Sequence, residues 1–218
     1  MPEPSLLLTG FGPFPGVSEN PTEALADALD GERVLGFPVI GACLTVCFES
    51  IEEQVVGLLE RHRPRGVLLL GVAVKREVIG LEGQAYNLRE ADRPDAMGAI
   101  FPTPQALLPG EPLDQALPTH LDREGLLQAL LNQGLPAELS EDPGRYLCNA
   151  SFFHALHHSR TQPWSPPALF AHLPQLGNPI DKSSDKTWTI SDLDSATRLL
   201  LGGIASQVSR QQHPRWNS

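Results

Sequence analysis

VLLLGVAV, residues 67–74, is the longest apolar run in the chain. Its first half, Val67 to Leu70, carries only aliphatic side chains, which is typical of a central strand buried on both faces of a sheet. The run is far shorter than the roughly 20 residues that a membrane-spanning helix needs. It therefore predicts the middle strand of a largely parallel sheet that is covered by helices.

The segments before this run alternate between strand-like and helix-like patterns. We expect a short strand at 6–9 and an extended segment at 34–48. A helix is predicted to follow each of them, the first beginning at Asn20 and the second at Ser50. Both starts carry a glutamate three residues after the capping residue, and apolar residues then recur at helical spacing.

The segments after the run continue the alternation. The sequence predicts a strand or hairpin at 77–87, a helix at 123–133, an extended piece near Arg145, a helix at 149–158, a strand at 168–172 and a last helix capped by Ser191 and Asp194. Residues 92–120 contain six prolines and are expected to be irregular. We predict one domain over 1–218, a three-layer α/β sandwich around a largely parallel twisted sheet.

The composition is that of an ordinary globular protein. Of the 218 residues, 41% are hydrophobic and 19% are charged, and the formal net charge is −10. This acidic balance opposes binding to nucleic acid or to anionic lipid. Three cysteines cannot all pair with one another, and the first residues carry no basic cluster typical of a secretion signal. We therefore expect a cytoplasmic protein with at least one free thiol.

Cys148 is the first candidate for chemistry. It lies between the short extended piece and the helix predicted at 149–158. A thiol at a helix N-terminus is near the positive end of the helix dipole, which favours the thiolate, and the free amides there can stabilise an oxyanion. The alternative is a buried, inert cysteine, which is the more frequent fate of a single cysteine.

His172 and Glu82 are the candidates for a base and for a carboxylate that orients it. His172 ends the strand predicted at 168–172, at the edge where open α/β sheets bind ligands. It could take the thiol proton and return it to a leaving amine. Glu82 stands in an otherwise uncharged stretch, where its burial is costly unless it is paired. The alternatives are a hydrogen-bonded strand-end histidine and a solvated carboxylate.

Several other aromatic, cysteine and histidine side chains give weaker evidence of a functional site. Phe11 and Phe14, on a stiff Gly/Pro turn, suggest either the wall of a small apolar pocket or core packing. Cys43 and Cys47 are expected in the core. An exposed helix face, rather than a metal site, is expected for three histidines at helical spacing, His154, His157 and His158.

Taken together and in this order, these segments resemble pyroglutamyl peptidase I, also called pyrrolidone-carboxylate peptidase. The matching residues extend over nearly the whole chain and are Thr9-Gly10-Phe11, Pro13-Phe14, Asn20-Pro21-Thr22, Glu82, Tyr146-Leu147-Cys148-Asn149 and Phe170-Ala171-His172-Leu173-Pro174. The resemblance implies a Cys148–His172–Glu82 triad that releases an N-terminal pyroglutamyl residue through a thioester acyl-enzyme. It implies no metal and no cofactor.

The resemblance also implies how the substrate is held. A neutral, compact lactam suits an apolar pocket with a few backbone hydrogen bonds. The residues expected to line it are Phe11, Phe14, Val72, Tyr146 and Leu147, and Asn20 is expected to support the first loop beside the site. The natural partners would be peptides with a pyroglutamyl N-terminus.

The chain departs from the family pattern at four positions. The family usually has Glu in place of Gly12, a polar residue in place of Val72, and Arg in place of both Gly83 and Asp92. A cation near the nucleophile would favour both thiolate and oxyanion. Our hypothesis is that Arg93, one position along, supplies it.

These departures keep two alternatives open. One is a weakly active or inactive relative that binds pyroglutamyl or other cyclic termini, and the other is a thiol hydrolase of a different small amide. We also expect self-association into a homo-oligomer, a dimer or a tetramer, since large exposed apolar patches are uncommon on monomers. The side chains expected to be exposed in the Pro-rich segment are Ile100, Phe101, Leu107 and Leu108.

Overall fold

The computed structural model describes residues 3–180 and 186–212, so the other residues of the predicted 1–218 domain lie outside it. The helices are α1 (Pro21–Leu29), α2 (Ile51–His62), α3 (Arg123–Asn132), α4 (Leu147–Thr161) and α5 (Ile190–Gln212). The strands are β1 (Leu6–Phe11), β2 (Arg33–Val34), β3 (Phe37–Leu44), β4 (Gly66–Ala73), β5 (Ile79–Glu82), β6 (Gln84–Tyr86), β7 (Arg89–Ala91), β8 (Phe101–Gln105), β9 (Ala116–Pro118), β10 (Ala137–Ser140) and β11 (Ala168–Pro174).

The apolar run forms the middle of the main sheet, as predicted. The seven strands follow the order β10-β5-β11-β4-β1-β3-β2, so β4 is the fourth. Neighbouring strands are parallel except for β5 with β11 and β2 with β3. Leu68, Leu69 and Leu70 of β4 are fully buried. Such a strand has no polar face because helices cover both of its sides.

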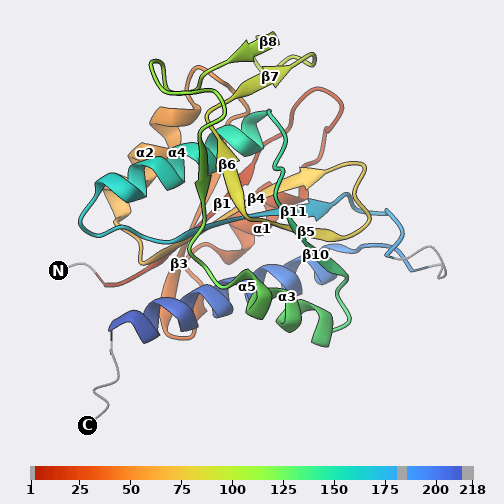
Figure 1. Ribbon diagram of the computed structural model, residues 1–218. Coiled ribbons are helices and arrows are strands. Elements are labelled where there is room, and N and C mark those ends of the chain that lie inside the picture. Colours follow the sequence, from red (N-terminus) through yellow and green to blue (C-terminus); the bar gives the residue numbers. More distant parts are fainter. Residues whose placement is uncertain (1–2, 181–185, 213–218) are drawn as a thin grey trace.

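Helices cover the sheet on both faces (Figure 1). On one side α2 and α4 pack against each other, and their apolar residues join a core with Leu7, Leu69 and Phe170. On the other side α1, α3 and α5 share a second core with Leu68 and Leu169. The three-layer α/β sandwich is therefore confirmed.

Helix starts and ends were predicted less accurately. Asn20 caps α1 as expected, through its side-chain oxygen and the amide of Thr22. Ser50 makes no such bond at the start of α2, because its hydroxyl accepts from Gln54 instead. The cap of α5 is Thr189, which exchanges hydrogen bonds with Asp192, and not Ser191 with Asp194.

The extended piece expected near Arg145 forms no strand among the described residues, and a strand, β10, lies a few residues earlier. The fourth helix begins at Leu147 rather than at residue 149. Cys148 therefore lies inside the first turn of α4, immediately after its first residue.

The Pro-rich segment is less irregular than expected. It contains β8, which pairs with β7, and β9, which pairs with β6. The β7–β8 pair extends beyond the layer of α2 and α4 (Figure 1). Asn87 secures the following loop, because its amide group donates to three backbone carbonyls there and its oxygen accepts from the amide of Leu108.

The expected apolar patch on this segment needs correction. Ile100 is 54% exposed, but the side chains of Phe101, Leu107 and Leu108 are half-buried against the core under α2 and α4. Phe101 contacts the ring of Phe48 edge-on. The exposed apolar side chains of this region are instead Met97, Ile100 and Leu113.

Two other expectations about exposure were wrong in part. Cys47 is buried, but Cys43 is exposed. His154 is buried rather than solvent-facing, and burial lowers its pKa to about 4. His157 and His158 are half-buried on the same helix.

None of the helices that the structure describes is both long and apolar enough to cross a bilayer.

Candidate active site

The candidate residues meet at the carboxyl ends of the central strands. His172 of β11 is the register partner of Gly71 on β4. A Cβ atom at Gly71 would lie 2.9 Å from the Cys148 Sγ and 2.7 Å from the Phe170 ring. The missing side chain at Gly71 therefore provides the space in which the thiol of α4 approaches the sheet beside His172.

His172 and Glu82 form a short buried contact. The Nδ1 of His172 lies 2.8 Å from the Oε1 of Glu82. Their strands run antiparallel, with His172 opposite Gly80 and Phe170 opposite Glu82, so the two side chains are diagonal neighbours on one face. Both residues are buried, and Glu82 has no exposed surface.

The pKa values of this pair are shifted in the directions that an ion pair requires. Burial of His172 opposes its charged form, but the charge of Cys148 and its hydrogen bond, together with Glu82, raise the His172 pKa to about 9. Burial would raise the Glu82 pKa, but the hydrogen bond and charge of His172, aided by Ser140 and Arg76, hold that pKa below its ordinary value. The arrangement therefore favours an imidazolium at His172 next to a carboxylate at Glu82.

Cys148 occupies the N-terminal turn of α4. The capping residue of this helix, Tyr146, makes no side-chain cap bond, so the first amides of the helix remain available as donors. Donors in this position can stabilise negative charge on sulfur or on a nearby oxygen.

Asn149 anchors this turn to the neighbouring strand. Its side-chain oxygen accepts from the amide of Tyr86, and its nitrogen donates to the carbonyls of Tyr86 and Leu88 at 2.8 and 2.7 Å. Asn149 is fully buried. Its supporting role was not predicted, although it stood in the quoted motif beside the cysteine.

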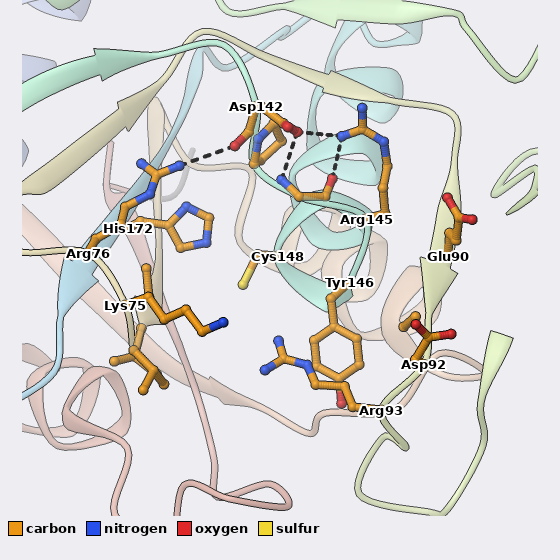
Figure 2. A pocket seen from close by; sticks show the side chains of 16 residues that line it. Lys75, Arg76, Glu90, Asp92, Arg93, Asp142, Arg145, Tyr146, Cys148 and His172 are labelled. Atoms are coloured by element: carbon orange, nitrogen blue, oxygen red, sulfur yellow. Dashed lines mark hydrogen bonds and ion pairs between the residues drawn. The ribbon is translucent and has the colours of Figure 1, made fainter. Parts of the chain in front are cut away.

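Two hollows meet at the thiol. The smaller one, about 10 Å³ in volume, is lined by Phe11, Phe14, Asn20, Val46, Val72, Arg93, Tyr146, Leu147 and Cys148. All the predicted ring-binding residues are therefore gathered beside Cys148. The larger one is an open cleft of about 620 Å³ that also reaches His172. Figure 2 shows the Cys148 sulfur between His172 on one side and Tyr146 with Arg93 on the other.

Arg93 lies across the boundary of the two hollows. Its guanidinium is 4.0 Å from the ring centre of Tyr146 and 5.3 Å from that of Phe14. The Arg93 cation lines the hollow beside the thiol, whereas the Asp92 carboxylate lines only the open cleft.

The loop that carries Arg93 is held in two ways. The carboxylate of the buried Asp95 accepts hydrogen bonds from the amides of Phe48, Met97 and Ala99. The hydroxyl of Tyr146 donates to the carbonyl of Pro94 at 2.8 Å. Burial raises the pKa of Tyr146 to about 12, so this donor keeps its proton. Asp95 was missed in the sequence because its partner Phe48 lies 47 positions away.

The first loop is supported by Asn20, as expected. Besides capping α1, its amide nitrogen donates to the carbonyl of Gly12 at 3.2 Å. A Cβ atom at Gly12 would have its nearest neighbour at 3.5 Å, the Sγ of Cys43. The absence of the usual glutamate there leaves open space and does not disturb the loop backbone.

Two arginines near Glu82 were not predicted. The Nη1 of Arg76 lies 3.0 Å from the Oε1 of Glu82. Arg123, at the start of α3, donates to the carbonyls of Leu81 and Ser140, and its guanidinium fills the space beside Gly83. A side chain at Gly83 would collide with it. The one available sequence signal was that Arg76 is a cation six positions before a carboxylate that is costly to bury.

Comparison with known proteins agrees with this geometry. The family model described as pyroglutamyl peptidase matches residues 5–204. A pyrrolidone-carboxylate peptidase of Pyrococcus furiosus is 34% identical over 175 residues, which cover 80% of this chain and 83% of that protein. One from Gloeobacter violaceus is 37% identical over 78% of this chain and 82% of its own length.

Solved structures agree as well. The pyrrolidone carboxyl peptidase of Thermus thermophilus superposes with a TM-score of 0.78 at 34% identity, covering 91% of this chain and 99% of that one. The enzyme of Thermococcus litoralis superposes with a TM-score of 0.86 at 28% identity, over 95% of this chain and 96% of that one. The chain belongs to the pyroglutamyl peptidase family of cysteine peptidases.

Proposed function

We propose that this protein removes an N-terminal pyroglutamyl residue from peptides, with Cys148 as nucleophile, His172 as acid and base, and Glu82 as the group that orients the imidazole. The observation that carries the proposal is the chain of contacts from the carboxylate through the imidazole to the thiol, beside an apolar hollow. Family membership supports the reaction type, and the contacts support the roles of the three side chains.

The first half of the reaction forms a thioester. The Cys148 thiolate attacks the carbonyl carbon that follows the lactam ring, and the carbonyl electron pair moves onto oxygen. Free amides at the start of α4 stabilise this oxyanion. When the carbonyl re-forms, the bond to the peptide nitrogen breaks, and His172 gives its proton to the departing amine.

The second half releases the product. Neutral His172 takes a proton from a water molecule, whose oxygen attacks the thioester carbon. The carbon–sulfur bond then breaks, 5-oxoproline leaves, and the sulfur departs as thiolate beside the newly charged imidazole. Glu82 keeps the Nδ1 of the imidazole occupied through both halves, so the other ring nitrogen stays directed at the reacting atoms.

The small hollow is the proposed ring site. Its walls are mainly apolar, which suits a neutral lactam. A volume of about 10 Å³ holds little more than one water centre, so a ring needs outward movement of the wall. Phe14 is only half-buried and Arg93 is exposed, so these two side chains are the ones free to move. Phe11, Val72 and Leu147 are buried and would form the rigid part.

We assign Arg93 the role of the cation that the family usually carries one position earlier. It lines both hollows, so its guanidinium is close to where the reacting carbonyl would lie. From there it would favour the thiolate and the oxyanion. Asp95 secures the loop that carries Arg93. A fixed backbone limits the conformational entropy lost when the flexible Arg93 side chain is held in place.

The open cleft is the proposed site of the departing peptide. It is lined by Cys148 and His172, with Lys75 on one side and Glu90 and Asp92 on the other (Figure 2). A long, open cleft accommodates peptides of different lengths, whereas the small hollow accepts only the terminal ring.

The test is release of a fluorophore from pyroglutamyl, prolyl and glutaminyl amides by the purified full chain. We expect rapid release from the pyroglutamyl amide alone, inhibited by iodoacetamide and lost in Cys148→Ala. Binding of a pyroglutamyl peptide without release would instead identify an inactive relative. Preference for the prolyl or glutaminyl amide would identify a hydrolase of another amide.

We also propose that the protein is a cytoplasmic homo-oligomer. The exposed side chains of Met97, Ile100 and Leu113 supply apolar surface for self-association. The three cysteines are all unpaired, which suits a reducing compartment. Sedimentation at micromolar concentration should show a dimer or tetramer, and a purely monomeric species would contradict this. Cell fractionation should recover the chain with the cytoplasm.

A further inference from the structure

Arg76 forms a second ion pair with Glu82, in addition to the one that His172 forms. It lies in the loop between β4 and β5, and its Nη1 is 3.0 Å from the same oxygen, Oε1, that His172 contacts at 2.8 Å. The carboxylate oxygen thus lies between the imidazole and the guanidinium. Arg76 also lines the open cleft beside Cys148 and His172.

The guanidinium is held in place from its other side. Its Nη2 donates to the hydroxyl of Ser140 at 3.1 Å. It also donates to the carbonyl of Asp142 at 3.2 Å (Figure 2). The loop itself is tied down by Asn178, which donates to the carbonyls of Val74 and Arg76. Arg76 is therefore a fixed part of the site and not a free surface side chain.

Gly80 makes this contact possible. A Cβ atom at Gly80 would lie 1.9 Å from the Nη1 of Arg76, so any other residue would displace the guanidinium. Gly80 is also the register partner of His172. The absence of a side chain at this position opens the route by which Arg76 reaches a carboxylate that has no solvent exposure.

The charge balance of the site depends on this arginine. A thiolate, an imidazolium and a carboxylate together carry a net charge of −1 in a buried place, which is costly without a further cation. Arg76 supplies a cation on the Glu82 side, as Arg93 does on the thiol side. The other groups that face Glu82 are His172 on β11 and Ser140 on β10, with Cys148 beyond His172 and Glu138 4.0 Å from Arg76.

We propose that Arg76 is a positioning residue for the reaction: through Glu82 it fixes the orientation and the ionised state of the carboxylate on which His172 depends. This inference rests on the proposed function of the Cys148 site. The guanidinium is not required to touch the substrate, because it contacts Glu82 Oε1, the same oxygen that His172 contacts.

The experiment compares pH profiles of the full chain on the pyroglutamyl amide. In R76M the Glu82 carboxylate loses the cation that lowers its pKa, so it takes up a proton at higher pH than in the natural protein. We expect the acidic limb of kcat/KM to move to higher pH. We also expect kcat to fall about 10- to 100-fold, the scale found when outer partners of metal-binding side chains are removed, with KM little changed.

Two further variants separate charge from geometry. R76K keeps a cation and should restore the position of the acidic limb and part of kcat, although lysine lacks the planar fork that joins Glu82 to Ser140. G80A keeps the arginine but blocks its route, so it should move the limb in the same direction as R76M. Thermal unfolding identifies any variant that has lost its fold. If R76M does not fold, the pH profiles of G80A and R76K still test the role of Arg76.

Arg198 provides the matched control. It forms an exposed ion pair with Asp194 on α5 at 2.8 Å, far from the site in the chain. R198M should leave the pH profile unchanged. An R76M or G80A profile identical to that of the natural protein, with kcat retained, would overturn the inference while leaving the proposed function intact. An inactive natural chain would overturn both.

Discussion

Glu82 and His172 are joined by a 2.8 Å contact across one of the two antiparallel pairings of the main sheet, that of β5 with β11. The residues opposite each other are His172 with Gly80 and Glu82 with Phe170. This register places the two functional side chains diagonally on one face, with no strand between them. The reversal of β5 therefore brings the carboxylate next to the base.

Glu82→Gln tests this contact with almost no change of shape. The amide can still bond to the imidazole, but it carries no charge and can enforce the wrong tautomer. We expect kcat on the pyroglutamyl amide to fall on the order of 10³–10⁴-fold, as for carboxylates that orient a catalytic histidine. The control is Glu138→Gln, at an exposed acid near Arg76, which should keep nearly full activity. Equal activity of both variants would contradict the role of Glu82.

The raised pKa of His172 predicts the alkaline behaviour of the protein. The folded-state pKa of about 9 lies above the ordinary 6.5, so the folded form binds the extra proton more tightly. The resulting stabilisation is complete below pH 6.5 and is lost as pH rises through about 9. Activity should fall over the same range, because neutral His172 cannot protonate the leaving amine.

Denaturant unfolding and initial rates across this pH range measure both effects. In Cys148→Ala the anion and hydrogen bond that raise the His172 pKa are missing, so the loss of stability with rising pH should become shallower. An unchanged pH dependence in this variant would show that the thiol and the imidazole do not interact.

Asn149→Ala should destabilise the protein and disturb the nucleophile together. The change leaves an amide and two carbonyls on the β6 side without their buried partner, which costs about 1–3 kcal/mol for each unsatisfied group. Because α4 then loses its anchor next to Cys148, kcat should fall as well. The exposed Asn132→Ala at the end of α3 is the control. A variant with natural stability in urea and natural kcat would refute the anchoring role.

The features that local sequence determines were predictable. The apolar run of β4 indicated a strand buried on both faces, and Asn20 before a proline indicated the start of α1. Both depend on neighbours only a few residues away. Thr189 and Ser191 each have an aspartate three residues later, so sequence alone could not decide between them as the cap of α5.

The features that depend on distant contacts were not predictable. Asn149 bonds to Tyr86, 63 positions away, and the contact of Arg123 with Leu81 joins segments 42 positions apart. His154 was expected on an exposed face, but α4 packs against the main sheet, against α2 and against β6, so nearly all of its first ten residues are buried. No pattern within α4 itself reports the presence of α2.

Arg93→Met tests whether this cation acts on the reaction. Methionine keeps contact with the rings of Tyr146 and Phe14 but removes the charge near the thiol. We expect kcat/KM for the pyroglutamyl amide to fall by up to about 10²-fold, the lower range for losing a donor to a developing oxyanion, with partial recovery in Arg93→Lys.

The control for Arg93 is Arg89→Met. Arg89 makes a similar contact, 4.1 Å above the ring of Phe101, but lines neither hollow. It should change stability slightly and activity very little. If Arg93→Met retains full turnover while Cys148→Ala has none, Arg93 does not replace the cation that the family usually carries.

The most direct measurement is mass spectrometry of the chain quenched in acid during turnover of a pyroglutamyl ester. We expect a mass increase equal to one pyroglutamyl group, located by peptide mapping on Cys148 and absent from Cys148→Ala. Turnover that persists in Cys148→Ala, or an adduct located on any other side chain, would contradict it.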